Sequence, residues 1–407
     1  MLSKLRNNPV MAFFTSFRLM YQFSLGVVVP FWSIILLEAG WETVEITYFF
    51  AISAFVVFLF GGIVGKFADF IGKKKMILTG LLIQAFFFMF YFFFAENIML
   101  ILVARVFEIF AFMLIGMVGL SALEDYLEDS ERGFWTGLFL GIGAIGMMVG
   151  PVIAGYIAEV NIPKVLLIVS AVITLLSILI LNKIPIKHNK LKHKFSYSDL
   201  NPLSEVKRFL HFKKLRGMAL LGILMNSKAQ IYAIFFPIFI VETLVLPIYY
   251  VGYLYSIPVF FHLFQAVFGK YFDKVSTEAG VLVGVSLSSI AMFMFPYVNS
   301  LWTLCILLCV YGIGSSIWNV TAWSLMGSIA KKYEMEAEVT GTYMSIAKLG
   351  VFITTLFSAG LIATFGIERT LQMASISIFI GVIICYFVFQ PIFHGKLRKS
   401  NFDLIKN

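Results

Sequence analysis

Charged residues are scarce in this chain. Only 13% of its 407 residues are Asp, Glu, Lys or Arg, whereas 60% are hydrophobic and the mean hydropathy is +0.93. A water-soluble domain of this length could not bury so much apolar surface, so its solvent must be largely lipid. The composition therefore excludes a soluble protein and predicts an all-α membrane protein.

Cysteine is also scarce, and the motifs of common catalytic chemistry are missing. Cys305, Cys309 and Cys385 all lie within apolar runs, so we expect no disulfide, metal or redox role for them. Glycine-rich phosphate loops, metal-ligand clusters and nucleophile elbows are absent from the sequence. We therefore expect no enzyme, cofactor or metal site.

Long apolar runs recur along the chain, each with the roughly 20 residues that a membrane-spanning helix needs. The first run is too long for a signal-peptide core and is expected to remain as a span. Twelve spans are predicted, at residues 11–37, 46–66, 75–95, 98–122, 133–158, 163–182, 216–241, 248–271, 278–297, 301–329, 339–364 and 370–393.

A short repeat divides the chain into halves. The run GKFAD at 65–69 returns as GKYFD at 269–273, half the chain length away, and both follow a long apolar segment. A duplicated helical unit explains this spacing. We expect two six-helix bundles, residues 1–182 and 216–407. The polar segment 183–215 between them is either a linker ending in a helix on the membrane surface or a disordered charged tether.

The charge distribution predicts the orientation. Most Lys and Arg residues lie in segments on the same side as both termini, while Lys164 and Arg369 fall on the other side. The positive-inside rule makes the basic side cytoplasmic, so we expect a multi-pass protein of the cell membrane with both termini inside. The +9 net charge thus reflects topology. We expect a lipid bilayer as a partner, no nucleic acid, and a monomer. The outer loops are instead acidic, with Glu38, Glu42, Glu45, Glu96, Glu159 and Glu242.

The loop between the second and third spans resembles motif A of the major facilitator superfamily. It contains Gly65, Asp69, Gly72, Lys73 and Lys74 at the family's spacing. Gly65 would let two helices approach closely, and Gly72 would allow a tight turn. Asp69 would cap a helix or pair with a cation to hold the cytoplasmic side shut. The family's usual Arg or Lys after the Asp is replaced by Phe70, so a charge relay through that position is in doubt.

Two further loops resemble gating elements of the same family. Asp125, followed by Glu131, Arg132 and Gly133, is similar to the D…ERG stretch, whose acid pairs with the motif A cations. The resemblance implies Lys73 or Lys74 as its partner. In the second half, Gly269 and Asp273 repeat Gly65 and Asp69.

The fifth span resembles motif C, which is characteristic of drug/proton antiporters in this superfamily. Its residues are Gly137, Gly146, Gly150, Pro151 and Gly155, with Ala154 in place of one glycine. The glycine face would let a neighbouring helix pack tightly, and Pro151 would remove a backbone hydrogen bond and bend the span. A generic stripe of small packing residues is the alternative.

Arg105 and Glu108 in the fourth span partly resemble motif B of the same exporters. Three residues apart, they share a helix face and can neutralise each other. Such a pair is a coupling device if it exchanges a proton and a structural clamp if it does not. Both interpretations remain open.

Other polar residues in the spans are expected to face one central cavity, because burying them in lipid is costly. Cations outnumber the one intramembrane acid, Glu108, which favours an anionic or zwitterionic substrate. The alternative for Arg18 is a side chain that extends to the membrane interface, and the alternative for His262 is a neutral, hydrogen-bonded core residue. The expected cavity residues are Arg18, Tyr21, Gln22, Arg105, Glu108, Asn226, Lys228, His262, Gln265 and Lys348.

The resemblance covers essentially the whole chain and implies the major facilitator fold. It also implies a secondary active transporter that works by alternating access. The motif in span five favours proton-coupled export of small amphipathic organic compounds, whereas the surplus of cations favours a uniporter or symporter of a small organic anion. A non-transporting receptor or scramblase on the same fold has no supporting feature.

Overall fold

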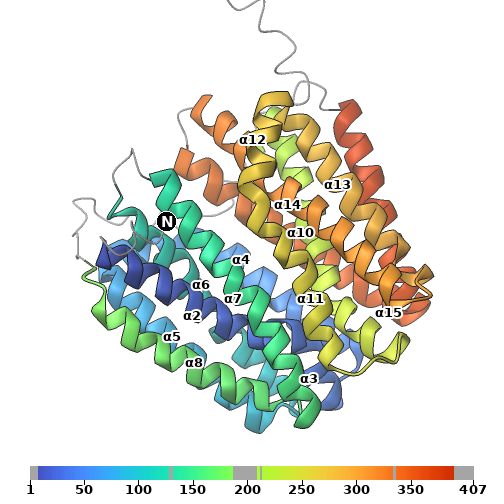
Figure 1. Ribbon diagram of the computed structural model, residues 1–407, viewed down its shortest axis with the longest axis horizontal. Coiled ribbons are helices and arrows are strands. Elements are labelled where there is room, and N and C mark those ends of the chain that lie inside the picture. Colours follow the sequence, from blue (N-terminus) through green and yellow to red (C-terminus); the bar gives the residue numbers. More distant parts are fainter. Residues whose placement is uncertain (1–7, 128–131, 187–208, 211–212, 333–335, 389–407) are drawn as a thin grey trace, which may run out of the picture.

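The computed structural model describes residues 8–127, 132–186, 209–210, 213–332 and 336–388, and throughout these ranges the chain is helical with short connections. Eleven helices in this part are long and apolar enough to cross a membrane. In lipid every backbone N–H and C=O must be satisfied within the protein, which a helix does locally. Figure 1 shows the helices of the first half, in blue to green, beside those of the second, in yellow to red.

In the first half, Pro30 breaks the first span and Gly72 makes the turn between the second and third. Proline has no N–H to donate within a helix, and a short 3₁₀ segment forms there. Gly72 has φ 108°, which glycine adopts without strain, so a single residue links two helices as expected. The elements are α2 (Pro9–Val28), η1 (Val29–Phe31), α3 (Trp32–Glu38), α4 (Thr43–Ile71), α5 (Lys73–Phe94), α6 (Ile98–Glu124), α7 (Arg132–Val160) and α8 (Val165–Lys183).

In the second half, Pro237 precedes a π-helical turn, at the place that corresponds to Pro30. The eighth span is also interrupted, at His262–Phe264, which the sequence did not predict. The elements are α10 (Lys213–Ile238), η3 (Phe239–Thr243), α11 (Tyr249–Phe261), η4 (His262–Phe264), α12 (Gln265–Val275), α13 (Thr277–Met294), η5 (Phe295–Tyr297), α14 (Leu301–Lys332) and α15 (Glu336–Val388).

The last element, α15, contains two membrane crossings. As one straight helix its 53 residues would be about 80 Å long, against a hydrocarbon core of about 30 Å. Gly366, with φ 76° and ψ 177°, interrupts the helix between the two crossings, within the predicted gap between spans eleven and twelve. With this division the chain crosses twelve times, and the predicted fold of two six-helix bundles is confirmed.

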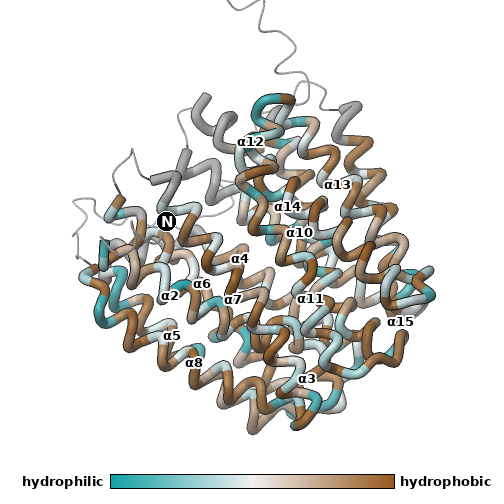
Figure 2. The backbone as a smooth tube through the Cα atoms, in the orientation of Figure 1, coloured by the Kyte–Doolittle hydropathy of each residue, from teal (hydrophilic) through white to brown (hydrophobic). Residues whose placement is uncertain are grey.

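Helices of each half pack mainly with one another, and two pairs form the most extensive contacts between the halves. In the first half α2 packs against α7 and α8, and in the second α10 packs against α15 and α13 against α14. Between the halves, α4 meets α15 and α7 meets α11. The outer faces are apolar, with side chains such as Phe93 and Phe357 exposed, and hydrophilic residues gather towards the helix ends (Figure 2).

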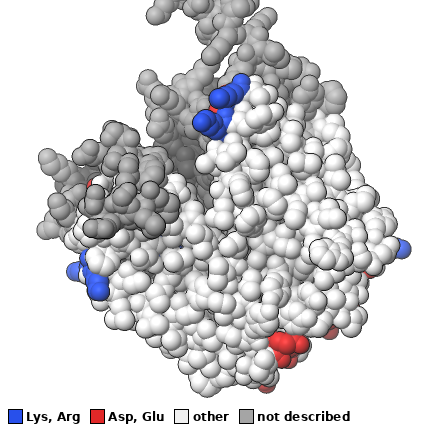
Figure 3. Space-filling model, in the orientation of Figure 1, with Lys and Arg blue, Asp and Glu red and all other residues white. Residues whose placement is uncertain are grey.

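The two ends of the molecule differ in charge. Lys73, Lys74 and Lys183 lie at the end that we call the basic end, where Lys74 Nζ donates to the backbone oxygens of Asn182 and Ile184, at 3.0 and 2.8 Å. Glu38, Glu42, Glu159 and Glu242 lie at the opposite, acidic end. On the face shown in Figure 3, Lys and Arg appear at the left, at the top and at the right edge, and Asp and Glu gather at the bottom. Residues 187–208 of the predicted linker lie outside the described ranges.

Candidate functional site: a cavity in the second half

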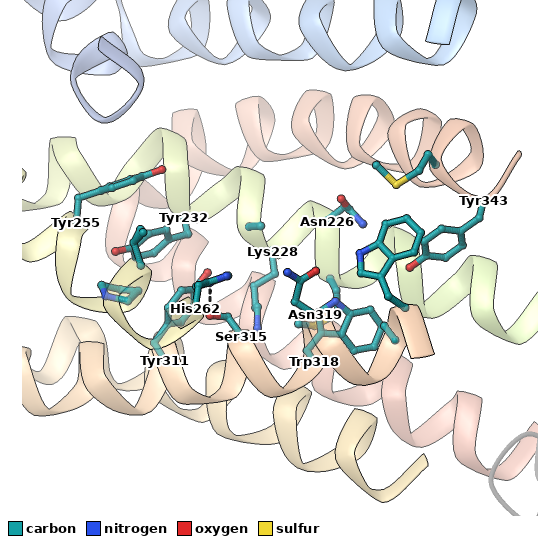
Figure 4. Close-up of a pocket in the computed structure, with 17 residues that line it drawn as sticks. Asn226, Lys228, Tyr232, Tyr255, His262, Tyr311, Ser315, Trp318, Asn319 and Tyr343 are labelled. Carbon is teal, nitrogen blue, oxygen red and sulfur yellow. Dashed lines mark hydrogen bonds between the residues drawn. The ribbon is translucent and has the colours of Figure 1, made fainter. Parts of the chain in front are cut away.

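A cavity of about 340 Å³ lies among α10, α11, η4, α14 and α15. It runs from Tyr255, near the acidic end of its half, to Tyr343, nearer the basic end (Figure 4). A volume of this size can hold a small organic molecule. Its lining consists of Met225, Asn226, Lys228, Ala229, Tyr232, Tyr255, Pro258, Val259, His262, Tyr311, Ser315, Trp318, Asn319, Ala322, Trp323, Tyr343 and Met344.

Helical spacing brings these side chains to one wall. On α14 the lining residues follow one another at intervals of three or four, from Tyr311 through Ser315 and Trp318 to Ala322. On α10 the positions 225, 228, 229 and 232 do the same. Residues three or four apart share a helix face, so two helices each contribute a continuous stripe.

Aromatic rings form much of the wall. Tyr232 and Tyr311 stack with their ring centres 4.6 Å apart, and Tyr255 lies 5.9 Å from Tyr232. Nearer the basic end, Trp323 meets Tyr343 edge to face at 5.8 Å. Flat rings give an apolar ligand large contact area, while phenolic hydroxyls offer hydrogen bonds. The hydroxyl of Tyr232 is buried and has no hydrogen-bond partner among the described residues.

Lys228 supplies positive charge to this cavity. Its side chain is 1% exposed, its ammonium group donates to Ser288 Oγ, and it lies 5.2 Å from the ring centre of Tyr311. Ser288 itself donates to the carbonyl of Gly284, at 2.7 Å, so its lone pairs face the lysine. An ammonium group has three donors. The hydrogen bond to Ser288 uses one of them, and the other two can serve a ligand.

His262 lies on the same wall, in the 3₁₀ interruption of the eighth span. The amide nitrogen of Gln265 lies 2.7 Å from its Nδ1, and Ser315 Oγ lies 3.5 Å from its Nε2. With the amide as donor to Nδ1, the neutral ring carries its proton on Nε2 and presents a donor. His262 and Gln265 therefore form a hydrogen-bonded polar pair at the point where the apolar eighth span is interrupted.

The Arg105–Glu108 pair lies elsewhere, within the first half. The two side chains form a buried ion pair, and Arg105 Nε donates to Ser53 Oγ at 2.7 Å. The guanidinium also lies over the rings of Phe49 and Trp32, 4.1 and 5.4 Å from their centres. Neither charged residue is among those lining the cavity. Protein groups therefore enclose the pair on several sides, which is the arrangement expected of a structural clamp.

The remaining expected cavity residues are likewise not in its lining. Tyr21 donates to Gln84 Oε1 at 3.1 Å, and Arg18 lies over the ring of Phe139 at 5.1 Å. Gln22 packs near Gly143 of α7. Lys348 is half-buried on α15 and does not line the cavity either. Of the predicted set, the structure thus brings together Asn226, Lys228 and His262, with Gln265 bound to the histidine.

The predicted partnership of Asp125 with Lys73 is present. The Lys73 ammonium lies 2.7 Å from the Asp125 carboxylate and also donates to the backbone oxygen of Ser121 at 3.3 Å. This contact ties the start of α5 to the end of α6 within one half. The surroundings of Gly65, Asp69 and Arg132 lie outside the described residues, so the predicted approach of Asp69 to span eleven stays a prediction.

The second copy of the gating run has its own contacts. A Cβ on Gly269 would lie 2.9 Å from Val320 of α14, so the glycine allows α12 and α14 to approach closely. Asp273 accepts a hydrogen bond from Ser324 of α14, at 3.2 Å. Both residues therefore connect the same two helices.

The small residues of α7 pack against two different helices. A Cβ on Gly146 or Gly150 would lie within 3.0 Å of the α2 backbone, so close packing there requires glycine. Gly155 and Pro151 instead contact α11, where a Cβ on Gly252 would come 2.1 Å from the Pro151 carbonyl oxygen. Gly137 has no such neighbour within 4 Å. The motif thus joins the halves as well as packing the first one.

This junction of α7 and α11, which we call the acidic-end seam, also carries polar contacts. Ser256 Oγ donates to the carbonyl of Met148 at 2.7 Å. The hydroxyls of Tyr156 and Tyr253 hydrogen-bond, and the Tyr249 N–H donates to Glu159 at 3.3 Å. All these residues lie in the part of each helix nearer the acidic end. These contacts hold the halves together on that side, and α4 and α15 join them as well, with the ring centres of Phe55 and Phe352 4.8 Å apart.

Sequence reasoning missed the aromatic and amide lining. Tyr232, Tyr311, Trp318, Asn319 and Tyr343 sit in apolar spans and carry no charge that would single them out. A signal was present on α14, where the polar and aromatic residues recur at helical spacing. Such a stripe inside a membrane helix indicates a polar cavity rather than lipid.

Comparisons with known proteins agree with this architecture. A profile described as Major Facilitator Superfamily matches residues 14–353. An uncharacterized MFS-type transporter of Methanocaldococcus jannaschii is 24% identical over 390 residues, which cover 94% of this chain and 98% of that protein. Two crystal structures of the nucleoside transporter NupG, one of a point mutant, each have a TM-score of 0.78. The unmutated NupG structure is 13% identical to this chain and the mutant structure is 14% identical. Both matches cover 94% of this chain, and they cover 99% and 100% of the respective NupG chains.

Sequence identities of 13% and 14% to the NupG structures show a shared fold and nothing more. The profile, however, covers most of the chain, and the helices have the length and composition of membrane spans. The protein is thus an integral, multi-pass membrane transporter rather than an enzyme. The chain belongs to the major facilitator superfamily.

Proposed function

We propose that the protein is a secondary transporter that moves small amphipathic organic compounds by alternating access. The cavity around Lys228 is its substrate site. The observation that carries this proposal is the composition of the wall, which combines stacked aromatic rings with Lys228, Asn226 and Asn319. The rings suit an apolar body, and the polar groups suit a polar head.

Alternating access requires that the halves separate at one end at a time. The acidic-end seam holds α7 against α11, while the cavity extends towards Tyr343 and the basic end. If the basic end is cytoplasmic, as the positive-inside rule predicts, this conformation faces inwards. Rocking of the halves would open the seam and give the cavity access to the other side.

Proton-coupled export is the proposed mode of transport. It is supported by the resemblance of the Gly146–Gly155 segment to the antiporter motif and by the seam that this segment forms. The test is efflux of a substrate panel in energised inverted vesicles, with and without an uncoupler. Accumulation that the uncoupler abolishes supports export. Accumulation that the uncoupler does not change contradicts proton coupling.

A second candidate function is uniport or symport of a small organic anion. Lys228 specifically favours it, because this cation lines the cavity while no carboxylate is among the described lining residues. The panel should therefore contain carboxylates alongside neutral and cationic compounds. Nucleosides belong in it too, because a base can stack on Tyr311 or Trp318 and the structural relatives are nucleoside transporters. Preference for acids over their amides supports this second candidate.

A further inference from the structure

The cavity contains an ammonium group without a counter-ion among the described residues. No carboxylate is among the described residues that line the cavity. The other titratable groups near Lys228 are the tyrosines of α10, α11, α14 and α15, the imidazole of η4, and a second ammonium on α15. Ser288 of α13 contributes only a hydroxyl. These titratable groups are Tyr232, Tyr255, Tyr311, Tyr343, His262 and Lys348.

Closing the cavity makes this lone charge costly. The Lys228 side chain is 1% exposed and its ammonium group is bound to Ser288, so little water reaches it even in this conformation, and an occluded site would remove the rest. A charge buried without a partner must then be paired or neutralised. Two events satisfy the requirement: a bound anion, or loss of the ammonium proton. The first applies to the loaded transporter and the second to the empty one.

We propose that Lys228 carries an anionic substrate and a proton together through the membrane. In its ammonium form it pairs with the substrate carboxylate, and the neutral complex crosses. On the far side the anion leaves, and the ammonium releases its proton to water. Lys228 returns as a neutral amine and then takes up a new proton with the next anion. One anion and one proton move per cycle, without net charge.

Nearby groups define the substrate class as an aromatic monocarboxylate. Tyr232 lies one helical turn from Lys228 on α10 and stacks on Tyr311, and its unpartnered hydroxyl points away from the lysine nitrogen (Figure 4). The Tyr311 ring, 5.2 Å from the lysine nitrogen, and Trp318 provide apolar surface beside the carboxylate head group. The inference rests on the second candidate function, transport of an organic anion through this cavity.

The test uses the full chain in liposomes with labelled benzoate, phenylacetate and their uncharged amides. Lys228→Arg keeps a positive charge that cannot be removed, because the guanidinium stays protonated in proteins. This variant should retain anion-for-anion exchange but lose net uptake at least tenfold. Lys228→Met should lose both. Lys183→Arg, at the basic end of α8, is the matched control and should behave as wild type.

Three outcomes would overturn the inference. One is net, proton-linked uptake by Lys228→Arg at the wild-type rate, and another is unchanged acid binding by Lys228→Met. Arginine is larger than lysine and can disturb the packing of this buried site, so the third measurement uses the wild-type protein. A voltage-sensitive dye should report no potential during net uptake, and a sustained potential contradicts the paired movement of anion and proton.

The amides separate this inference from the proposed function. Transport of the amides in preference to the acids contradicts the role of Lys228 but leaves transport through the cavity intact. If neither set nor any other member of the substrate panel is transported, the proposed function fails, and the inference fails with it. Electroneutral uptake of the acids that depends on Lys228 supports both.

Discussion

At the scale of single residues, Arg105 and Glu108 show most clearly how buried charges are stabilised by neighbouring groups. The guanidinium has a carboxylate, a serine hydroxyl and two aromatic faces as partners. Removing one member of a buried pair leaves an uncompensated charge, whereas replacing both with apolar groups can be nearly neutral. We therefore assign the pair a structural role.

We predict that Glu108→Gln lowers the free energy of unfolding by about 3–5 kcal/mol, because Arg105 then stays buried without its partner. The double variant Arg105→Met, Glu108→Leu should recover most of this loss. Thermal unfolding of the purified protein in detergent measures both. A Glu108→Gln protein with wild-type stability but no proton-driven transport would instead show that Glu108 is the proton site.

The cavity residues show how far single positions can be predicted from sequence. Lys228, Asn226 and His262 stood out because polar groups in apolar spans are costly, and the structure places all three in the lining. The same argument also selected Arg105 and Arg18, which neighbouring rings accommodate outside the cavity. Polarity identifies a buried residue that needs a partner, but only the packing decides whether that partner is protein or cavity.

At the scale of elements, α11 contributes side chains to both the acidic-end seam and the cavity, from different faces of the helix. Gly252, Tyr253 and Ser256 contact α7, while Tyr255 and Val259 line the cavity. Tyr253 and Tyr255 are two residues apart, about 200° around the helix, so they point in nearly opposite directions. A substrate that shifts Tyr255 must therefore move the helix that closes the acidic end.

We predict that Gly252→Ala prevents closure of the acidic-end seam. Its Cβ would lie 2.1 Å from the Pro151 carbonyl oxygen, a contact that the two backbones cannot relieve without separating. Transport should fall at least tenfold while the protein stays folded. Spin-label distances across the acidic end should lengthen.

Gly137→Ala is the matched control on α7, because nothing lies within 4 Å of the added carbon. It should transport as wild type. If Gly252→Ala also keeps wild-type transport and distances, the seam does not need this close approach.

A milder change at the seam should have a smaller effect. Tyr253→Phe removes the hydrogen bond to Tyr156 but keeps the ring packing. A hydrogen bond contributes about 0.5–1.5 kcal/mol net, so the closed population should fall by about two- to tenfold relative to the open one. The same spin-label distances measure this shift. Tyr297→Phe, exposed on η5, is the control, and an equal shift in that variant would contradict the assignment.

At the scale of the whole molecule, the sequence predicted the number of crossings because each apolar run matches the thickness of the bilayer. Gly366 ends the eleventh crossing within the predicted gap, and Gly72 makes the predicted turn. The interruption at His262 was not predictable, since the residues around it remain apolar. Closure at the acidic end was not predictable either, because it depends on contacts between α7 and α11, about 100 residues apart.

The most direct test of the central claim is the accessibility of the cavity wall at Asn319, which lies between Lys228 and the basic end. An Asn319→Cys variant is made in a background in which Cys305, Cys309 and Cys385 are replaced by Ala. It is then treated with a membrane-impermeant thiol reagent from either side. Ile306→Cys, on the exposed apolar face of the same helix, is the control. The account predicts rapid labelling of Asn319→Cys from the basic side, protection by a transported substrate, and no labelling at position 306, which faces lipid. Labelling that no transported substrate slows, or no labelling from the basic side, would contradict it.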